Sequence, residues 1–588
     1  MRFRISIFAF WIGVCLVPCG HAFAEQAAGQ ADTPPEIATD ARFRAVVRAR
    51  EYMVVTAHAE ATKAGSEIIE AGGNAIDAMV AVQAVLGLVE PQSSGLGGGA
   101  FLLHFDAASK ELVSLDGRET APRAATPEYF LDDDGNPKPF LEASQGGRAV
   151  GTPGTVALMA AAHRRFGKLA WQQVLQPAIR LARDGFAISP RLAESISAMA
   201  ENLFPFSEAR GYFMTEEAVP LFAGTVVKNH AYADTLERIA RDGATAFYEG
   251  EVASDIVAAV AGSPIEPGLL DLDDLAFYRA IERAPLCFDY RKWRICSMGP
   301  PSSAGHTLAQ IFAMIEPFEL GASNFNDPDA WRRIGDATRL AFADRDRHLA
   351  DPDFEPAPHG LADPAYLARR ATLLEGEMAL GADAVQPGNP PDDRTRIFGD
   401  DASAEIPSTS HFSIVDRAGN VVSMTTSIEK SFGSGLMVRG FLLNSELTDF
   451  SFVPDREGAR VANRVEGGKR PRSSMAPTIV FEDGKPIIAL GATGGSRIIP
   501  FVAAKLVAIL DWGMPLDRAL AAAHLVNRYG TYEVEAGTAA TRLAPALEAI
   551  GYPVRELELD SGMHAVRITP NSLEGAVDPR REGVASGR

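Results

Sequence analysis

Three side chains that can do chemistry stand together at Thr409, Ser410 and His411, where a polar segment meets an apolar strand pattern. The preceding segment, 384–408, is rich in Pro, Asp and Ser and poor in core residues, which predicts a loop or linker. The hydroxyl of Thr409 is therefore either a nucleophile held at the rigid start of a strand or part of an ordinary strand residue.

A second hydroxyl is predicted beside the first. The stretches 409–416 and 421–427 alternate around the turn sequence RAGN, which predicts a β-hairpin. This hairpin places Thr409 opposite a point within one residue of Ser427. A hydroxyl pair suits nucleophilic catalysis, although Thr and Ser also favour strands and caps for structural reasons.

Other motifs supply groups that could assist acyl chemistry. The backbone N–H groups of two glycines in GATGGSR could face an oxyanion, because no Cβ blocks the approach. Two serines start a strand in KRPRSSMAPT, and two acids lie in LLNSELTDF. Each group alone is equally common in turns and caps. The residues are Gly494, Gly495, Ser473, Ser474, Glu446 and Asp449.

Several kinds of site find no support in the sequence. It has no G-x-S-x-G, H-E-x-x-H or G-x-x-x-x-G-K-[ST] motif, and its 11 histidines lack metal-ligand spacing. We therefore expect no metal and no cofactor. The net charge of −20 argues against nucleic-acid binding, because phosphates would repel the chain.

The elements that must position these residues change in character along the chain. Helical periodicity dominates 60–91, most of 151–280, and 304–351. Short alternating strands dominate 409–491, and one apolar helix follows the glycine pair. Helices, then strands, then helices without a regular βαβ rhythm predict an α/β (α+β) layered sandwich.

The N-terminus has the pattern of a secretory signal. A short basic region precedes an apolar run too short for a membrane span, and Ala22–Ala24 offers small residues for cleavage. We expect a signal peptide over 1–24, cut after Ala24, a flexible leader over 25–42, and a periplasmic or secreted protein without a membrane anchor. Lipid attachment at Cys19 is an alternative that the preceding proline disfavours.

Two cysteines remain after removal of the signal, Cys287 and Cys296. They lie in a predicted hairpin that turns at Arg291-Lys292, and in that register they stand opposite each other. An exported protein can keep a disulfide there. A disulfide and two free buried thiols both remain open.

Taken together, the motifs resemble those of the γ-glutamyltransferase (γ-glutamyltranspeptidase) family of N-terminal nucleophile hydrolases. The resemblance runs from about Met53 to Glu582 and is specific because so many motifs occur in order. It implies a four-layer αββα sandwich. The motifs include GGNAIDAMVA, EPQSSGLGGG, DGRETAP, GTPGTVA, PPSSAG, FADRDRHLADPDF, TSHFSIVD, FLLNSELTDF, KRPRSSMAPT, GATGGSRI and DPRRE.

The resemblance implies that the chain first cuts itself. The hydroxyl of Thr409 would attack the carbonyl of Ser408, an N→O shift would form an ester, and water would release it. The products would be a large subunit, 43–408, and a small subunit, 409–588, of one intertwined domain. The freed α-amine titrates at about 8 and could act as the base for its own hydroxyl.

In the implied second reaction, Thr409 attacks a γ-glutamyl compound such as glutathione. Water or an amino acid or peptide acceptor would then resolve the acyl-enzyme. Ser427 would support the nucleophile, and the paired glycines would hold the oxyanion. Arg118, Ser473 and Ser474 would bind the substrate's α-carboxylate, and Glu446 with Asp449 would hold its α-ammonium.

The chain departs from the family pattern in several places. Glu429 stands where the family commonly has Asn, so that three carboxylates would repel one another unless one is protonated or points away. Ser427 replaces the usual Thr, and Ala304 replaces a Gly. The segment 453–468 suggests a shortened lid over the substrate.

Two other functions remain open. One is a related acylase of the same fold, for example one that removes glutaryl side chains from β-lactams. The acids at 429, 446 and 449 argue against it, because a glutaryl group has no ammonium. The other is an exported amino-acid or peptide binder without enzymatic activity, and an intact Thr409 argues against that.

Overall fold

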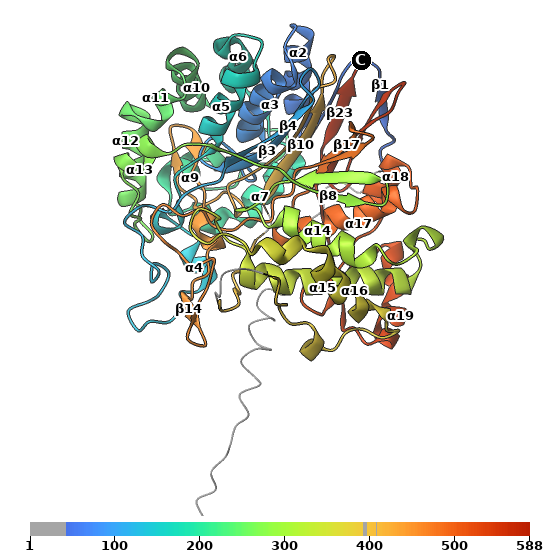
Figure 1. The fold of residues 1–588 in the computed structure, drawn as a ribbon. Coiled ribbons are helices and arrows are strands. Elements are labelled where there is room, and N and C mark those ends of the chain that lie inside the picture. Colours follow the sequence, from blue (N-terminus) through green and yellow to red (C-terminus); the bar gives the residue numbers. More distant parts are fainter. Residues whose placement is uncertain (1–42, 392–396, 407) are drawn as a thin grey trace, which may run out of the picture.

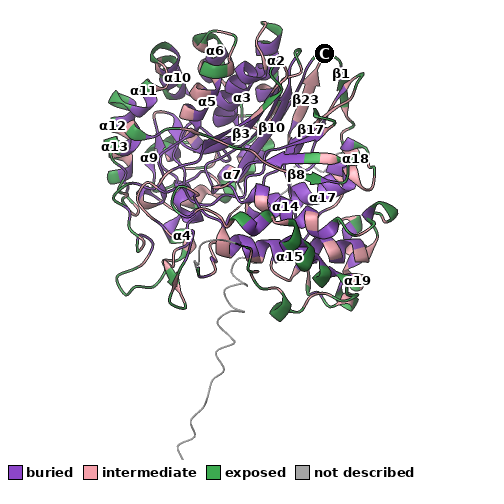
Figure 2. Cartoon of the chain, in the orientation of Figure 1, coloured by how far each residue is buried: buried purple, intermediate pink, exposed green. Residues whose placement is uncertain are grey.

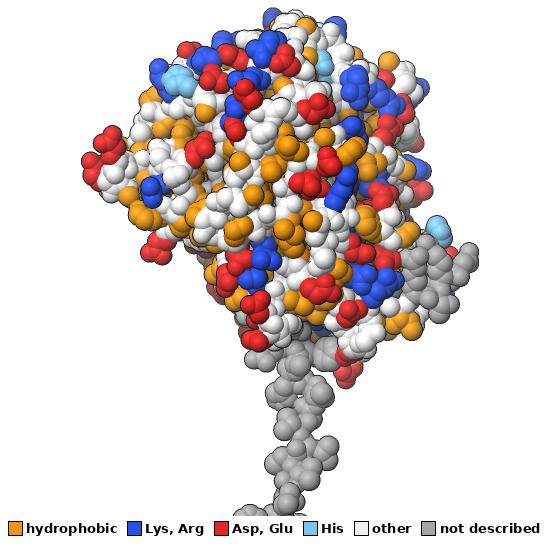
Figure 3. Space-filling view, turned by 90° about the vertical axis from the view of Figure 1, so that its left-hand side faces the viewer, with side chains coloured by type: hydrophobic (Ala, Val, Ile, Leu, Met, Phe, Trp, Pro, Cys, Tyr) orange, Lys and Arg blue, Asp and Glu red, His pale blue; other side chains and the backbone are white. Residues whose placement is uncertain are grey.

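The computed structural model describes residues 43–391, 397–406 and 408–588. The predicted signal peptide, 1–24, and the leader, 25–42, lie outside the described residues. Within the described ranges, no helix combines the length and apolar character that a membrane crossing needs. Figure 3 shows acidic, basic and apolar side chains interspersed over one face of the molecule.

Two seven-stranded antiparallel sheets form the centre of the molecule (Figure 1). The first sheet contains, in spatial order, β23 (Val584–Gly587), β2 (Met53–Thr56), β10 (Thr409–Val415), β11 (Val421–Ser427), β3 (Gly99–Asp106), β4 (Glu111–Gly117) and β7 (Ile281–Arg283). The second contains β1 (Val47–Ala49), β22 (Leu573–Val577), β21 (His564–Ile568), β17 (Lys485–Gly491), β16 (Thr478–Glu482), β9 (Trp293–Ser297) and β8 (Leu286–Tyr290).

Helices cover the outer face of each sheet, so the four-layer αββα order implied by the resemblance is confirmed (Figure 1). The first sheet is covered by α2 (Ala59–Glu70), α3 (Ala75–Val89), α5 (Thr155–Phe166) and α6 (Trp171–Asp184). The second is covered by α14 (Ala304–Ile315), α15 (Pro328–His348) and α17 (Ile498–Leu510). Figure 2 shows that buried residues follow the central strands.

Local sequence explains why α3 lies in the core. Asn74 caps its first turn, and Asn74 and Asp77 form a reciprocal capping box. All of its residues are buried, as the run of Ala and Val indicates. This helix supports β10 and β11 from outside, where Phe412 and Ile414 join the same core.

Alternation along β10 decides which side chains face the second sheet. Phe412 and Ile414 face the helices, whereas Val415 packs between the sheets with Ile479 of β16. Thr409 has the same parity as Val415. Its side chain therefore lies at the end of the layer between the two sheets.

The predicted hairpin around the two cysteines is confirmed. Strands β8 and β9 pair antiparallel, with Cys287 opposite Cys296, and the two residues form a disulfide. The alternative of two free thiols does not hold in this structure. The turn residue Arg291 has a φ of 54°, within the left-handed region that tight hairpin turns use.

Candidate active site

The β10–β11 hairpin brings Thr409 directly opposite Ser427, which confirms the predicted register. The hydroxyl of Ser427 donates a hydrogen bond of 2.9 Å to the carbonyl oxygen of Ser408. The same hydroxyl accepts a hydrogen bond of 2.8 Å from the amide of Glu429. The carbonyl just before Thr409 is thus held and polarised by a fixed donor.

The two glycines after β17 have backbones that other residues rarely adopt. Gly494 has a φ of 126° and Gly495 a φ of 58°. A Cβ at Gly495 would lie 2.6 Å from the carbonyl oxygen of Glu405. The linker therefore packs directly against the predicted oxyanion-binding loop.

The linker also fills the site. The cavity beside Thr409 has a volume of only about 20 Å³, close to the room for one water molecule. Most predicted site residues line it, but Ser408 and Gly494 do not, and Arg118 contacts it only through Glu446 and Asp449. Its lining consists of Glu405, Ile406, Thr409, Ser427, Glu429, Glu446, Asp449, Ser473, Ser474, Met475, Gly495 and Ile498.

Arg118 is fully buried and donates to protein acceptors on every side. It pairs with the carboxylates of Glu446 and Asp449, which one 3-10 turn (Glu446–Asp449) presents together. Its Nε donates to the Pro471 carbonyl at 3.1 Å, and its Nη2 to the Arg472 carbonyl at 2.9 Å. In the uncut chain, the predicted clamp for a substrate carboxylate is therefore occupied by acids of the site itself.

Carboxylates outnumber cations around Arg118. Glu119, Glu429, Glu446 and Asp449 are all buried, and each has at least one oxygen without a donor among the described residues. Burial, reinforced by Glu446, raises the pKa of Glu429 to about 8. Glu429 is therefore mainly protonated at neutral pH, which relieves the repulsion expected among the three carboxylates.

A second ionic group borders the cavity, and the sequence prediction missed it. Arg345 of α15 donates to Ser303 Oγ at 2.9 Å, to Ser474 Oγ at 2.8 Å and to the Glu405 carboxylate. Arg345 lies in FADRDRHLADPDF, one of the motifs that carry the family resemblance. Nothing in that motif indicates which residues Arg345 contacts. Ser474, predicted to bind a substrate carboxylate, is in contact with this guanidinium.

The predicted short lid lies beside the linker. Within 453–468 the chain forms a small hairpin of β14 (Asp455–Arg456) and β15 (Ala459–Arg460). Val461 forms an isolated bridge with Gly399 of the linker. This segment therefore contacts the polypeptide that fills the site.

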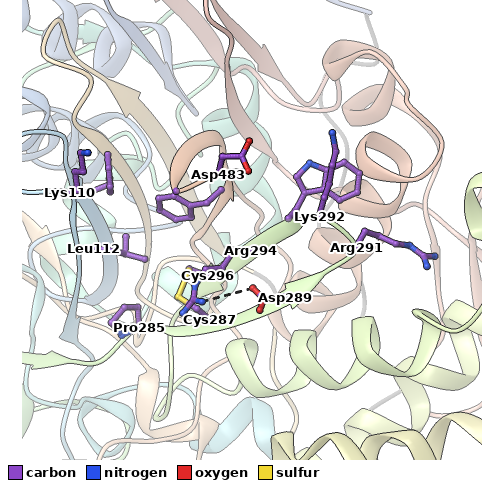
Figure 4. Close-up of a pocket in the computed structure, with 14 residues that line it drawn as sticks. Lys110, Leu112, Pro285, Cys287, Asp289, Arg291, Lys292, Arg294, Cys296 and Asp483 are labelled. Atoms are coloured by element: carbon purple, nitrogen blue, oxygen red, sulfur yellow. Dashed lines mark ion pairs between the residues drawn. A yellow bond between two sulfur atoms is a disulfide. The ribbon is translucent and has the colours of Figure 1, made fainter.

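A more open hollow lies away from this site. It has a volume of about 660 Å³ and surrounds the Cys287–Cys296 disulfide (Figure 4). Three of its basic side chains, Arg291, Lys292 and Arg294, have acidic partners, such as Lys292 with Glu482 at 2.6 Å. None of the predicted site residues lines it. A choice of active site by cavity volume alone would therefore select this hollow instead of the small cavity beside Thr409.

Comparisons with known proteins place the chain in a family. The family model described as gamma-glutamyltranspeptidase matches residues 61–588. The glutathione hydrolase proenzyme of Escherichia coli (strain K12) is 36% identical over 545 residues, which is 91% of each chain. The acylase ACY 1 proenzyme of Pseudomonas sp. (strain SE83) is 34% identical over 90% of this chain and 92% of its own.

A solved structure, the cephalosporin acylase from Bacillus halodurans, superposes with a TM-score of 0.80 at 26% identity. The superposition covers 93% of this chain and 97% of that one. The chain therefore resembles both a protein named a glutathione hydrolase and a protein named a cephalosporin acylase. On the family match and the E. coli relative together, the chain belongs to the gamma-glutamyltranspeptidase family.

Proposed function

We propose that the chain cuts itself between Ser408 and Thr409 and then acts as a γ-glutamyltransferase and glutathione hydrolase. The observation that carries the proposal is the hydrogen bond from Ser427 Oγ to the Ser408 carbonyl, opposite Thr409. This donor would stabilise the oxyanion that forms when the Thr409 hydroxyl adds to that carbonyl. The amide C–N bond breaks, the hydroxyl proton passes to the new α-amine, and water hydrolyses the ester.

Cleavage supplies the base for the second reaction. The α-amine of Thr409, with a pKa of about 8, takes the proton of its own hydroxyl as this attacks the γ-glutamyl amide. The backbone N–H groups of Gly494 and Gly495 stabilise the oxyanion once residues 405–408 have moved away. Water or the amine of an amino acid or peptide then releases the γ-glutamyl group.

The buried acids support recognition of a free amino-acid head group. Glu446 and Asp449 line the cavity, and each has one carboxylate oxygen without a donor among the described residues. An α-ammonium would supply the missing donors and a compensating charge. Arg118, Ser473 and Ser474 bind the α-carboxylate, which requires Arg118 to exchange one of its present acidic partners.

The two subunits are expected to stay together. In the first sheet, β10 and β11 of the small subunit pair with β2 and β3 of the large subunit. Separation would expose both cores.

An exported location follows from the N-terminal pattern and stays part of the proposal.

Acylase activity is the second candidate, and the relatives named acylases are the observation in its favour. The acid-rich surroundings of Arg118 oppose it, because a glutaryl group would bring no cation to Glu446 and Asp449. A binder without enzymatic activity is the remaining alternative. Such a protein would keep an uncut chain.

Turnover of matched anilides separates these functions. Cleaved protein should hydrolyse a γ-glutamyl-anilide with a kcat/KM at least about tenfold above that for the glutaryl-anilide, which lacks one charged hydrogen-bond donor. The Thr409→Ala variant should turn over neither. A higher kcat/KM for the glutaryl compound would replace the proposal with acylase activity, and turnover of neither by cleaved wild type would overturn both.

A further inference from the structure

One acid of the linker is bound as tightly as a residue of the core. Glu405 lies three residues before Ser408, and only 7% of it is exposed. Its carboxylate accepts a hydrogen bond from Arg345 Nη2, and Arg472 Nη2 lies 4.0 Å away. Although burial alone would raise it, these guanidinium groups hold the pKa of Glu405 below its ordinary value. Glu405 is therefore an ionised, paired carboxylate within a segment whose sequence predicts only a polar loop.

A second acid anchors the same segment four residues earlier. The carboxylate of Asp401 accepts a hydrogen bond of 2.9 Å from Asn463 and lies 2.8 Å from Arg472 Nη2. Its amide donates to the Asp346 carbonyl at 3.0 Å. Arg472 thus faces both linker acids and joins them to the strand-rich half of the chain.

These anchors fix the peptide bond that is to be cut. The Glu405 carbonyl packs against Gly495, Ser408 Oγ donates to the Gln92 carbonyl at 2.7 Å, and Thr409 begins β10. Only two residues separate Glu405 from Ser408. The anchored Glu405 therefore restricts how far the nearby Ser408 can move.

We propose that Glu405 is a positioning residue for self-cleavage, whose carboxylate clamps the linker onto Arg345 and Arg472 and so aligns the Ser408 carbonyl with Thr409. The inference rests on the proposed self-cleavage. Glu405 touches none of the reacting atoms. It lies on the polypeptide that must leave the cavity before a substrate can enter, so its role ends when the chain is cut.

The test measures cleavage separately from turnover. Precursor is purified under denaturing conditions and refolded, and the fraction cut is followed by intact mass. Glu405→Gln keeps the shape but removes the charge, and we expect cleavage to slow by about 10–100-fold, the size of effect that misplacement of reacting groups causes. Glu405→Asp should restore part of the rate. Once cut, each variant should hydrolyse the γ-glutamyl-anilide with a kcat/KM within about twofold of wild type, counted per Thr409 N-terminus.

A control exists in the same linker. Asp400 forms an ion pair with Arg347 at 2.6 Å, with both side chains partly exposed. Asp400→Asn should leave the cleavage rate unchanged, because an exposed pair contributes little. Equal slowing in Asp400→Asn and Glu405→Gln would overturn the inference.

Two further outcomes decide the matter. Cleavage of Glu405→Gln at the wild-type rate would overturn the inference while leaving the proposed function intact. Loss of a cooperative thermal transition in both Glu405→Gln and Glu405→Asp would also overturn it, because Glu405 would then hold the fold rather than the scissile bond. A wild-type chain that is never cut would instead refute the proposed function.

Discussion

Two buried ionic clusters border the scissile bond, and they differ in charge balance. The Arg118 cluster contains one guanidinium and the carboxylates of Glu119, Glu429, Glu446 and Asp449, each with an oxygen lacking a donor in the described chain. The Arg345–Arg472 cluster contains two guanidinium groups and the carboxylates of Asp346, Asp401 and Glu405.

The pKa values of the linker acids and of the acids around Arg118 follow this difference. Burial raises the pKa of Glu429, Glu446 and Asp449. In the other cluster, the guanidinium groups overcome burial and lower the pKa of the two linker acids, Asp401 and Glu405, whereas burial raises the pKa of Asp346 to about 6. The Arg118 cluster has more carboxylates than cations. Under the proposed function, the α-ammonium of a γ-glutamyl substrate would supply a further positive charge. Two of the three acids in the Arg345–Arg472 cluster, Asp401 and Glu405, come from the linker. Under the proposed function, the Arg118 cluster would serve the substrate and the Arg345–Arg472 cluster would serve the uncut chain.

Removal of Arg118 should have the largest effect, because it leaves several buried carboxylates without their cation. In an uncut Thr409→Ala background, Arg118→Met should lower the free energy of unfolding by about 3–5 kcal/mol. Arg48→Met is the control, since Arg48 pairs with Glu574 at an exposed site and should cost under about 1 kcal/mol. Urea denaturation measures both. Equal stability of Arg118→Met and its parent would show that the acids are not charged there.

Substitution of Asp449 tests whether this acid binds the α-ammonium of the substrate. Asp449→Asn removes a charged acceptor of the α-ammonium, so kcat/KM for the γ-glutamyl-anilide should fall by about 10–100-fold. Turnover of the glutaryl-anilide should not fall, because that substrate has no ammonium. Asp455→Asn, at the exposed hairpin, serves as the control. A parallel loss on both anilides would mean that Asp449 acts on the fold rather than on the head group.

The proton on Glu429 should make the stability of the folded chain depend on pH. Because its pKa is about 8 in the folded chain and about 4.5 when unfolded, its contribution to stability is full below pH 4.5 and is lost as the pH rises through 8. Glu429→Gln cannot lose that proton. Relative to its Thr409→Ala parent, the Gln variant should gain about 1.4 kcal/mol per pH unit from pH 5 to about 8, about 4 kcal/mol in total. If the free energies of unfolding of the Gln variant and its parent change equally with pH over this range, Glu429 does not hold a proton in the folded chain.

Local patterns predicted part of this site well. Alternation around a short turn fixed the register of Thr409 and Ser427, and the same reasoning paired Cys287 with Cys296. These contacts lie within one hairpin, where turn length determines which residues meet.

The Arg345–Arg472 cluster could not be predicted in this way. Arg345 and Glu405 are 60 positions apart, and their pairing depends on how α15 packs against the linker. The proton on Glu429 likewise depends on burial by distant elements. Long-range charge pairing leaves no periodic signal in the sequence.

Intact mass with N-terminal sequencing of the purified protein, beside its Thr409→Ala variant, tests the central claim most directly. The account predicts two wild-type pieces, the smaller beginning Thr-Ser-His-Phe, and a single uncut chain for the variant. A single uncut wild-type chain would contradict it, because the α-amine base would never form.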